Sequence, residues 1–452
     1  MEDKRLHDLE RLLLRVLVII EEAEGRHITN PAMVYQLNLL RKEMYRGYFT
    51  MDNLRSQGIE SESHDVSPSF AISKFNPTKR LFFSTISAHR DKDLQQVIDN
   101  LNNMVRDAYA LAMFLKNYPP LYRQPYSMHL FVGKSMFGRQ MEMERIMDFL
   151  FEREPLGTGS VQILPIVGPR YVGKSTLVAH ICNDARVRNY FSQTIKITGD
   201  DINNKLSTLN DGVAIMHKEN ALGENKKVLA IVELSGDVDE VSWNGLFLSS
   251  ICQLGRGSRI IITSRSNKVI KLGTTQPIVL NFLPPEAYWY FFKILTFGST
   301  NSSDYPELQS IAMVIARGLN GSFISANVHS GLLRNNNLVA KQWRMHLASL
   351  REHIERNASL YNVENAYDVV QKRNRPLCWK LKDDKLSIWY KECSCLAEEN
   401  VPTITIEDVL FERVKCEGAF DILVWKSHIP PYKFYILRCT VESGLKKDEV
   451  IH

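Results

Sequence analysis

Hydrophobic residues recur at three- and four-residue steps near the start of the chain, which predicts amphipathic helices. The first series consists of Leu6, Leu9, Leu12, Leu13, Val16, Ile19 and Ile20. Gly25 is expected to end this helix, and Thr29-Asn30-Pro31 to start a second one, because proline suits a first helical turn. The same periodicity returns over Asp91–Lys116 and predicts a further helix.

Two segments of this region lack the helical pattern. Ser, Gly and Pro are frequent between Ser56 and Lys79, which predicts a loop or disordered insert near residues 56–82. Residues 118–136, which begin with Tyr118-Pro119-Pro120, are predicted to form a linker. The sequence thus predicts an N-terminal helical bundle over residues 1–117. Helical spacing alone leaves open whether its apolar faces form only a core or also bind a partner helix.

The pattern changes after Gln162, where short β-rich runs alternate with helical stretches, as is typical of a parallel sheet. Three of these runs are continuously apolar, as expected of strands covered on both faces: Ile163–Val167, Val228–Val232 and Ile260–Thr263. We therefore expect an α/β domain over residues 137–285.

The last part of the chain predicts a helix over residues 341–354 and then strands at 403–406, 420–425 and 432–441. We expect a helical subdomain over residues 286–360 and a small β-rich α+β unit over residues 361–452. The predicted fold class is thus multidomain, α and α/β.

One motif with clear chemistry lies between the first apolar strand and a helical run. Its residues fit G-x-x-x-x-G-K-[ST] in full, and we refer to Gly168–Ser175 as the P-loop. Glycines let backbone N–H groups point inward and form a concave anion site at a helix N-terminus. Lys174 is expected to reach the β- and γ-phosphates of a nucleotide, and the Ser175 hydroxyl to ligate Mg²⁺.

The ends of the other two apolar strands carry charged residues. Glu233 is a candidate catalytic carboxylate. Together with Ser175 it is also a candidate residue of a Mg²⁺ site. The residue after it is Leu234, which cannot polarise water, and Asp237 and Asp239 could compensate only if the following loop folds back. We therefore expect nucleotide binding without fast hydrolysis. Arg265 ends the third strand, at the sheet edge where ligands bind in parallel sheets. It is either a phosphate contact or a solvated strand-end residue.

Composition narrows the function classes. The 56 Lys and Arg residues exceed the 51 Asp and Glu residues by only 5, and they are spread along the chain, unlike the basic stripe of a nucleic-acid-binding protein. No apolar run approaches the ~20 residues that span a bilayer. The odd number of 7 cysteines in a long chain favours a reduced setting. We expect a cytoplasmic location, with nuclear or membrane-peripheral locations left open.

The order of these motifs resembles the plant intracellular immune receptors that join an N-terminal coiled-coil-type bundle to an NB-ARC nucleotide-binding module. The resemblance covers residues 1 to 350, approximately, and the series from the P-loop to Arg265 is its most specific part. It implies an ADP- or ATP-dependent switch in defence signalling, with ADP holding the resting form. Through the motif and the resemblance, the candidate nucleotide-binding residues are Phe137, Gly138, Arg139, Gly168, Pro169, Arg170, Tyr171, Val172, Gly173, Lys174, Ser175, Thr176 and Arg265.

The chain departs from this family at several points. Glu233-Leu234 replaces two adjacent aspartates, and the family's Gly-Leu-Pro-Leu-Ala element aligns with Gly-Leu-Asn-Gly-Ser at residues 318–322. The sequence has no Met-His-Asp triplet and no leucine-rich period. These departures predict a truncated receptor without leucine-rich repeats.

Three functions fit these observations. The first is an ADP/ATP-binding regulatory switch of plant immune signalling. The second is a degenerate adaptor or decoy that pairs with a full-length receptor through its helical bundle without using nucleotide. The third is an active P-loop ATPase, which Leu234 disfavours, so that at most a weak ATPase is expected. The expected partners are other immune receptors or signalling proteins that bind the N-terminal bundle.

Overall fold

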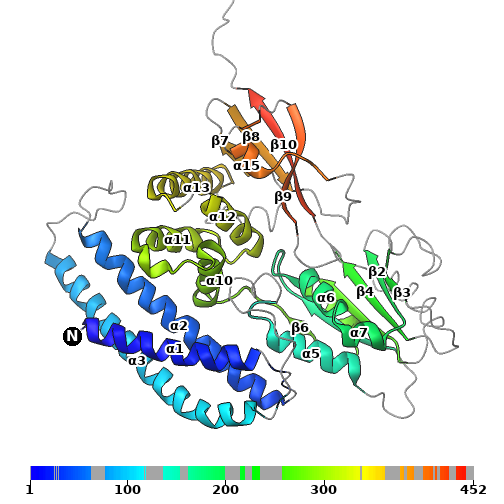
Figure 1. The fold of residues 1–452 in the computed structure, drawn as a ribbon. Coiled ribbons are helices and arrows are strands. Elements are labelled where there is room, and N and C mark those ends of the chain that lie inside the picture. Colours follow the sequence, from blue (N-terminus) through cyan, green and yellow to red (C-terminus); the bar gives the residue numbers. More distant parts are fainter. Residues whose placement is uncertain are drawn as a thin grey trace, which may run out of the picture. The chain divides into compact units, whose positions relative to one another are not determined.

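A computed structural model gives the fold of the chain (Figure 1). It describes residues 2–24, 26, 28, 30–62, 77–116, 118, 136–152, 161–198, 214–218, 227–234, 257–335, 338–361, 377–380, 384–390, 401–410, 413–414, 418–426 and 434–443. Most of the predicted linker lies outside these residues. The chain divides into two compact units: the first comprises Met1–Val132, Leu283–Leu319 and Leu333–Leu347, and the second comprises Gly133–Phe282, Asn320–Leu332 and Ala348–His452.

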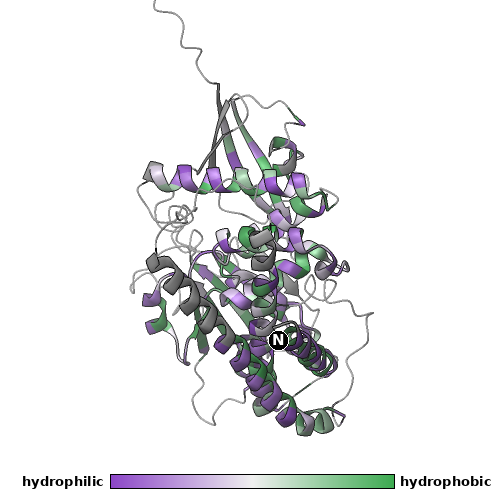
Figure 2. Cartoon of the chain, turned by 90° about the vertical axis from the view of Figure 1, so that its left-hand side faces the viewer, coloured by the Kyte–Doolittle hydropathy of each residue, from purple (hydrophilic) through white to green (hydrophobic). Residues whose placement is uncertain are grey.

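The first unit contains the predicted N-terminal helices. They are α1 (Glu2–Glu24), α2 (Pro31–Glu62) and α3 (Pro77–Leu115), and each packs against the other two. The Asn30 side chain caps α2, because its Oδ1 accepts a hydrogen bond from the Ala32 N–H at 2.9 Å. Hydrophilic and hydrophobic residues alternate along these helices (Figure 2). Their buried faces include Leu9, Leu13 and Leu101, each 0–1% exposed, so the predicted apolar stripes form a core.

The predicted insert near residues 56–82 overlaps helix at both ends, because α2 continues to Glu62 and α3 begins at Pro77. The Ser56 hydroxyl donates to the Asp52 carbonyl oxygen one turn earlier, at 2.8 Å. This bond satisfies a polar side chain within a helix, so serine content alone was a poor indicator of a loop. Residues 63–76 lie outside the described part of the chain.

A buried carboxylate joins α2 to two later helices of the same unit, α10 (Pro285–Phe297) and α11 (Pro306–Gly318). Asp52 is 0% exposed and accepts hydrogen bonds from Trp289 Nε1 at 2.7 Å, Lys293 Nζ at 2.9 Å and Gln309 Nε2 at 3.0 Å. The helices α10 and α11 thus share a compact unit with the N-terminal bundle.

The second unit contains the predicted parallel sheet. Among the described residues its strands are β1 (Gln162–Val167), β2 (Gln193–Thr198), β3 (Ala214–Lys218), β4 (Val228–Leu234), β5 (Arg259–Ser264) and β6 (Ile278–Val279), in the order β3-β2-β4-β5-β1-β6. Only β3 pairs antiparallel; the other strand pairs of this sheet are parallel. The three apolar runs are confirmed as β1, β4 and β5.

Helices cover one face of this sheet (Figure 1). They are α5 (Gln140–Phe151), α6 (Lys174–Cys182) and α7 (Ala185–Tyr190), and they share a buried cluster with Leu164, Leu229 and Ile261. The opposite face carries a second cluster, which includes Ile163, Val232 and, from a 3₁₀ helix over Asn267–Leu272, Val269. Both faces of the strands are thus buried, which explains their continuous apolar sequences.

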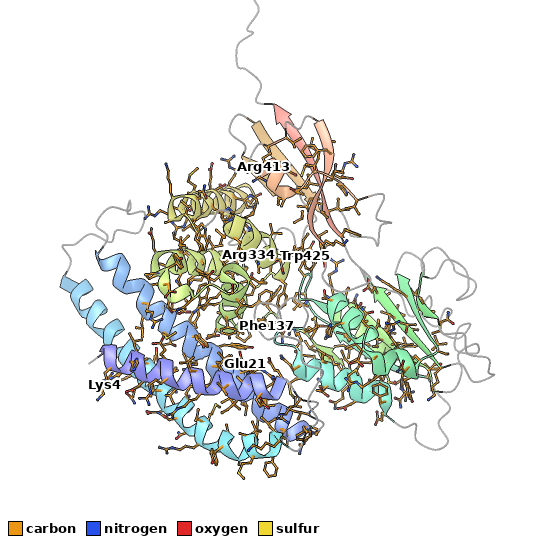
Figure 3. The ribbon with its side chains drawn as sticks, viewed as in Figure 1. Lys4, Glu21, Phe137, Arg334, Arg413 and Trp425 are labelled. Atoms are coloured by element: carbon orange, nitrogen blue, oxygen red, sulfur yellow. The ribbon has the colours of Figure 1, made fainter. Side chains whose placement is uncertain are left out.

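The remaining described elements follow the sheet domain. They are a 3₁₀ turn at Ser302–Asp304, α12 (Phe323–Asn335), α13 (Ala340–Tyr361), α15 (Ile406–Leu410) and four antiparallel strands, β7 (Leu377–Lys380), β8 (Asp384–Tyr390), β9 (Gly418–Lys426) and β10 (Phe434–Ser443), in the order β7-β8-β10-β9. The predicted helix over 341–354 and the strands over 420–425 and 432–441 are confirmed as α13, β9 and β10. Trp425 of β9 (Figure 3) lies 5.3 Å from Tyr435 of β10, ring centre to ring centre, so these aromatics stabilise the strand pair.

The predicted strand at residues 403–406 is reduced to an isolated parallel β-bridge between Thr405 and Leu423, and α15 begins at Ile406. Thr405 and Asp408 form a reciprocal cap: the Thr405 N–H donates to Asp408 Oδ2 at 2.9 Å, and the Asp408 N–H donates to Thr405 Oγ1 at 3.3 Å. Hydrogen bonding from the Thr405 hydroxyl lowers the pKa of Asp408. The alternating Thr and Ile residues looked like a strand, but the cap starts a helix.

Replacing Asp52 tests the buried cluster. Asp52→Ala leaves the Lys293 ammonium and two neutral donors buried without their acceptor, so we expect the free energy of unfolding to fall by about 3–5 kcal/mol. Urea unfolding measures this change. The control is Asp107→Ala, at an exposed position of α3, with an expected change within about 0.5 kcal/mol. Equal effects of the two substitutions would contradict the assignment.

Candidate functional site

The P-loop begins where β1 leaves the sheet, and its first glycine has no room for a side chain. The Gly168 N–H donates to the Ser264 carbonyl oxygen at 3.2 Å, and the Leu280 N–H donates to the Val167 carbonyl oxygen at 2.8 Å. A Cβ atom on Gly168 would lie 2.3 Å from the Leu280 carbonyl oxygen. The backbone of the loop can therefore pass between its neighbours only because residue 168 is glycine.

The end of the P-loop adopts left-handed backbone conformations that turn it into a helix. Tyr171 has a φ of 63°, and Gly173, the N-cap of α6, has a φ of 95°. The Leu177 N–H donates to the Gly173 carbonyl oxygen at 2.9 Å, which is the first hydrogen bond of α6. Within the described structure, no side chain caps this helix start. Its N–H groups and its dipole thus suit an anion.

Lys174 folds back over the loop. Its ammonium group donates to the carbonyl oxygens of Gly168 at 2.7 Å and Pro169 at 2.8 Å. Burial lowers the pKa of Lys174 to about 8, and repulsion from the charges of Arg265 and Arg170 acts in the same direction. The Lys174 ammonium group thus lies in a positively charged environment, where a bound polyphosphate would stabilise its charge.

Two predicted residues from other strands lie close enough to Lys174 to change its pKa. Arg265, which follows β5, lowers it, and Glu233, near the end of β4, raises it. The structure therefore gathers the P-loop, Arg265 and Glu233 at one end of the sheet, as the sequence predicted. Direct contacts of Ser175, Thr176 and Arg265 with a nucleotide stay predictions.

Glu233 has a partner that the sequence analysis missed. Its Oε2 forms an ion pair with Lys196 Nζ of β2 at 2.7 Å. In the register of the two strands Lys196 lies beside Ile231, two residues before Glu233, so the two charged side chains leave the same face of the sheet. Lys196 is the charged residue in the run Gln193–Thr198, and this was the sequence signal for a partner of Glu233. The signal could be interpreted only once the register of β2 and β4 was known.

These groups do not fit a resident Mg²⁺ ion, which is usually bound through one or two available carboxylates together with waters and substrate phosphates. The Glu233 carboxylate is already neutralised by Lys196. The Leu234 side chain is 4% exposed and belongs to the cluster on the opposite face of the sheet. In the described part of the chain no three His, Cys, Asp or Glu residues lie together so that they could hold a metal ion by themselves.

The segment before α5 braces the P-loop. Phe137 (Figure 3) is 6% exposed, and Gly138 has a φ of 68°. The buried Arg139 guanidinium donates to the carbonyl oxygens of Val172 at 3.3 Å and Asn281 at 2.5 Å. Burial lowers the pKa of Arg139, whereas the charge of Glu142 raises it. Arg139 thus holds the loop backbone; adenine contacts of residues 137–139 stay predictions.

The turn that lacks the expected proline places an aromatic residue beside the P-loop. Asn320 and Gly321 have φ values of 54° and 77°. Ser322 then starts α12, since its Oγ accepts from the Ser325 N–H at 3.2 Å. The Phe323 ring lies 4.0 Å from the position that a Cβ atom on Gly173 would take. Phe323 is thus a residue of the site region that the sequence analysis did not identify.

Three features define a P-loop nucleotide-binding fold. They are the parallel sheet, the loop that contains Gly168 and Gly173, and Lys174 at the start of α6. Residues 139–302 match the NB-ARC domain family. The chain is 24% identical over 370 residues to the "Putative disease resistance RPP13-like protein 1" of Arabidopsis thaliana, covering 77% of this chain and 35% of that protein. It is 26% identical over 215 residues to the "Disease resistance protein RGA2" of Solanum bulbocastanum, covering 44% and 22%.

This chain contains an NB-ARC domain and is homologous to plant disease resistance proteins. It spans about a third or less of the length of these relatives. None of the helices in the described ranges is long and apolar enough to cross a membrane.

The close approach at Gly168 can be tested with a matched pair of glycine substitutions. Gly168→Ala should displace the Leu280 backbone and lower the melting temperature, since contact with a carbonyl group at 2.3 Å cannot be relieved by a side-chain rotation. Gly331→Ala, in α12 with open space around its Cβ position, should raise stability by about 0.5–1 kcal/mol. Calorimetry compares the two. An unchanged melting temperature for Gly168→Ala would contradict this geometry.

Proposed function

We propose that this protein is an ADP/ATP-binding regulatory switch in plant immune signalling. The observation that carries the proposal is the P-loop with Lys174, which is partly buried near positive charges at the start of α6. The homology to plant disease resistance proteins supports the biological setting. In this proposal the P-loop amides and Lys174 hold the β-phosphate, and Arg265 contacts the phosphates from the end of β5.

The switch works through differential affinity. Phosphate oxygens replace the carbonyl oxygens of Gly168 and Pro169 as partners of Lys174, so binding moves the ammonium and releases the loop carbonyls. ADP and ATP differ by one phosphoryl group, and they shift the conformational equilibrium only as far as their affinities for its two states differ. The pairing of Glu233 with Lys196 supports binding rather than fast hydrolysis, since this carboxylate is engaged with a cation.

We further propose that the N-terminal bundle binds other immune receptors or signalling proteins. Five large apolar side chains are exposed on two of its helices: Leu14 and Val18 on α1, and Tyr109, Met113 and Phe114 on α3, each at least 56% exposed. Side chains of this kind form the buried centre of helix-mediated interfaces. Among the described residues Cys182 is a buried free thiol, which agrees with the proposed cytoplasmic location.

The nucleotide that co-purifies with the protein tests the binding function. We expect denatured wild-type protein to release ADP, detected by mass spectrometry, and Lys174→Ala protein to release at least about tenfold less, because a charge-assisted contact contributes ~1.5–3 kcal/mol. Lys341→Ala, at an exposed position of α13, is the control and should retain ADP. Nucleotide-free wild-type protein, or equal amounts from both proteins, would refute the proposal and favour the adaptor alternative.

The lowered pKa of Lys174 predicts a pH dependence of ADP affinity. Above about pH 8 the ligand-free lysine is neutral, whereas the phosphate-bound lysine is charged, so binding must take up a proton. Affinity should therefore fall by up to ~tenfold per pH unit between about pH 8 and pH 10. Calorimetric titration measures this, with Lys174→Arg as a variant that stays charged and gives a flat profile. A flat wild-type profile would argue against the role of Lys174.

A further inference from the structure

We propose that Lys196 supplies, beside Glu233, the positive charge that a divalent metal supplies in other P-loop sites, so that this protein binds nucleotide independently of Mg²⁺. The inference rests on the proposed nucleotide-binding function and adds the residue that sets its metal requirement. It starts from the disagreement between the donors at the site and those that a Mg²⁺ ion requires.

The geometry of the pair comes from the sheet. Strand β2 runs parallel to β4, with Lys196 beside Ile231 and Thr198 beside Glu233. The Lys196 and Glu233 side chains, 14% and 23% exposed, meet at 2.7 Å. They leave the face on which Leu229 and Ile231 pack with α6, the helix that begins with Lys174. The pair therefore lies on the P-loop face, shielded from much of the solvent.

The charges around the loop favour a cation that is part of the protein. Lys174 is repelled by Arg265 and Arg170 and attracted by Glu233, so all three charges act on its ammonium group. Lys196 adds a further positive charge in contact with Glu233. A divalent ion would have to displace Lys196 and enter this positive surrounding. A polyphosphate, by contrast, brings the negative charge that these groups lack.

The Lys196–Glu233 ion pair also explains how the protein would bind a nucleotide and yet hydrolyse it slowly. A carboxylate free of other partners can orient the waters around a metal and a nucleotide, whereas Glu233 is held by an ammonium group. Leu234 offers no second carboxylate, because its side chain lies in the opposite cluster. Lys196 can neutralise phosphate charge, but it positions no attacking water.

Affinity for ADP and ATP, measured by calorimetry with EDTA and with millimolar Mg²⁺, tests the proposal. Wild-type affinity should be the same within about twofold in both conditions. Lys196→Met keeps the length of the side chain but frees Glu233, so its metal-free affinity should fall about tenfold, and Mg²⁺ should restore most of the loss. Lys271→Met, an exposed position on the 3₁₀ helix of the opposite face, should behave as wild type.

Glu233→Gln provides a second test that does not depend on the folding of the first variant. Removing the carboxylate charge releases Lys196 toward the phosphates, so metal-free affinity should hold or rise severalfold. A wild-type affinity that increases tenfold or more with Mg²⁺, and loses this gain in Glu233→Gln, would overturn the role of Lys196 while leaving nucleotide binding intact. Undetectable binding of wild-type protein in both conditions would instead overturn the proposed function as well.

Discussion

The site depends on one close approach of two backbones. Gly168 lies so near Leu280 that a single added carbon would meet its carbonyl oxygen at 2.3 Å. This contact lets the chain leave β1 in a tight loop, after which the left-handed Gly173 starts α6. Arg139 also holds this loop through the Val172 carbonyl. The result is a loop that ends at a helix N-terminus without a side-chain cap, which suits an anion.

Side-chain charges then decide which anion suits the loop and what happens to it. Arg170 and Arg265 repel the Lys174 ammonium group, and a ligand with several negative charges relieves this repulsion. Glu233 is the acidic group among them, and it is engaged by Lys196. In the function proposed above, this balance of charges favours holding a nucleotide over hydrolysing it. That balance is the property expected of a switch.

Local sequence predicted the parts of the fold that local physics controls. The continuous apolar runs of β1, β4 and β5, the P-loop and the Asn30 cap all carry their signal within a few residues. The Lys196–Glu233 pair depends on the register of β2 and β4, and Asp52 meets Gln309 across 257 residues of sequence, so neither can be read from spacing. At residues 403–406 the Thr405–Asp408 cap overrode an alternating pattern.

The most direct test of this account is an experimental structure of the purified protein with ADP. The account predicts phosphate oxygens about 3 Å from the backbone nitrogens of Gly173, Lys174 and Ser175, with Lys174 Nζ turned from the loop carbonyls toward the β-phosphate. ADP bound elsewhere on the chain, or a saturating concentration of ADP that leaves Lys174 on the Gly168 and Pro169 carbonyls, would contradict it.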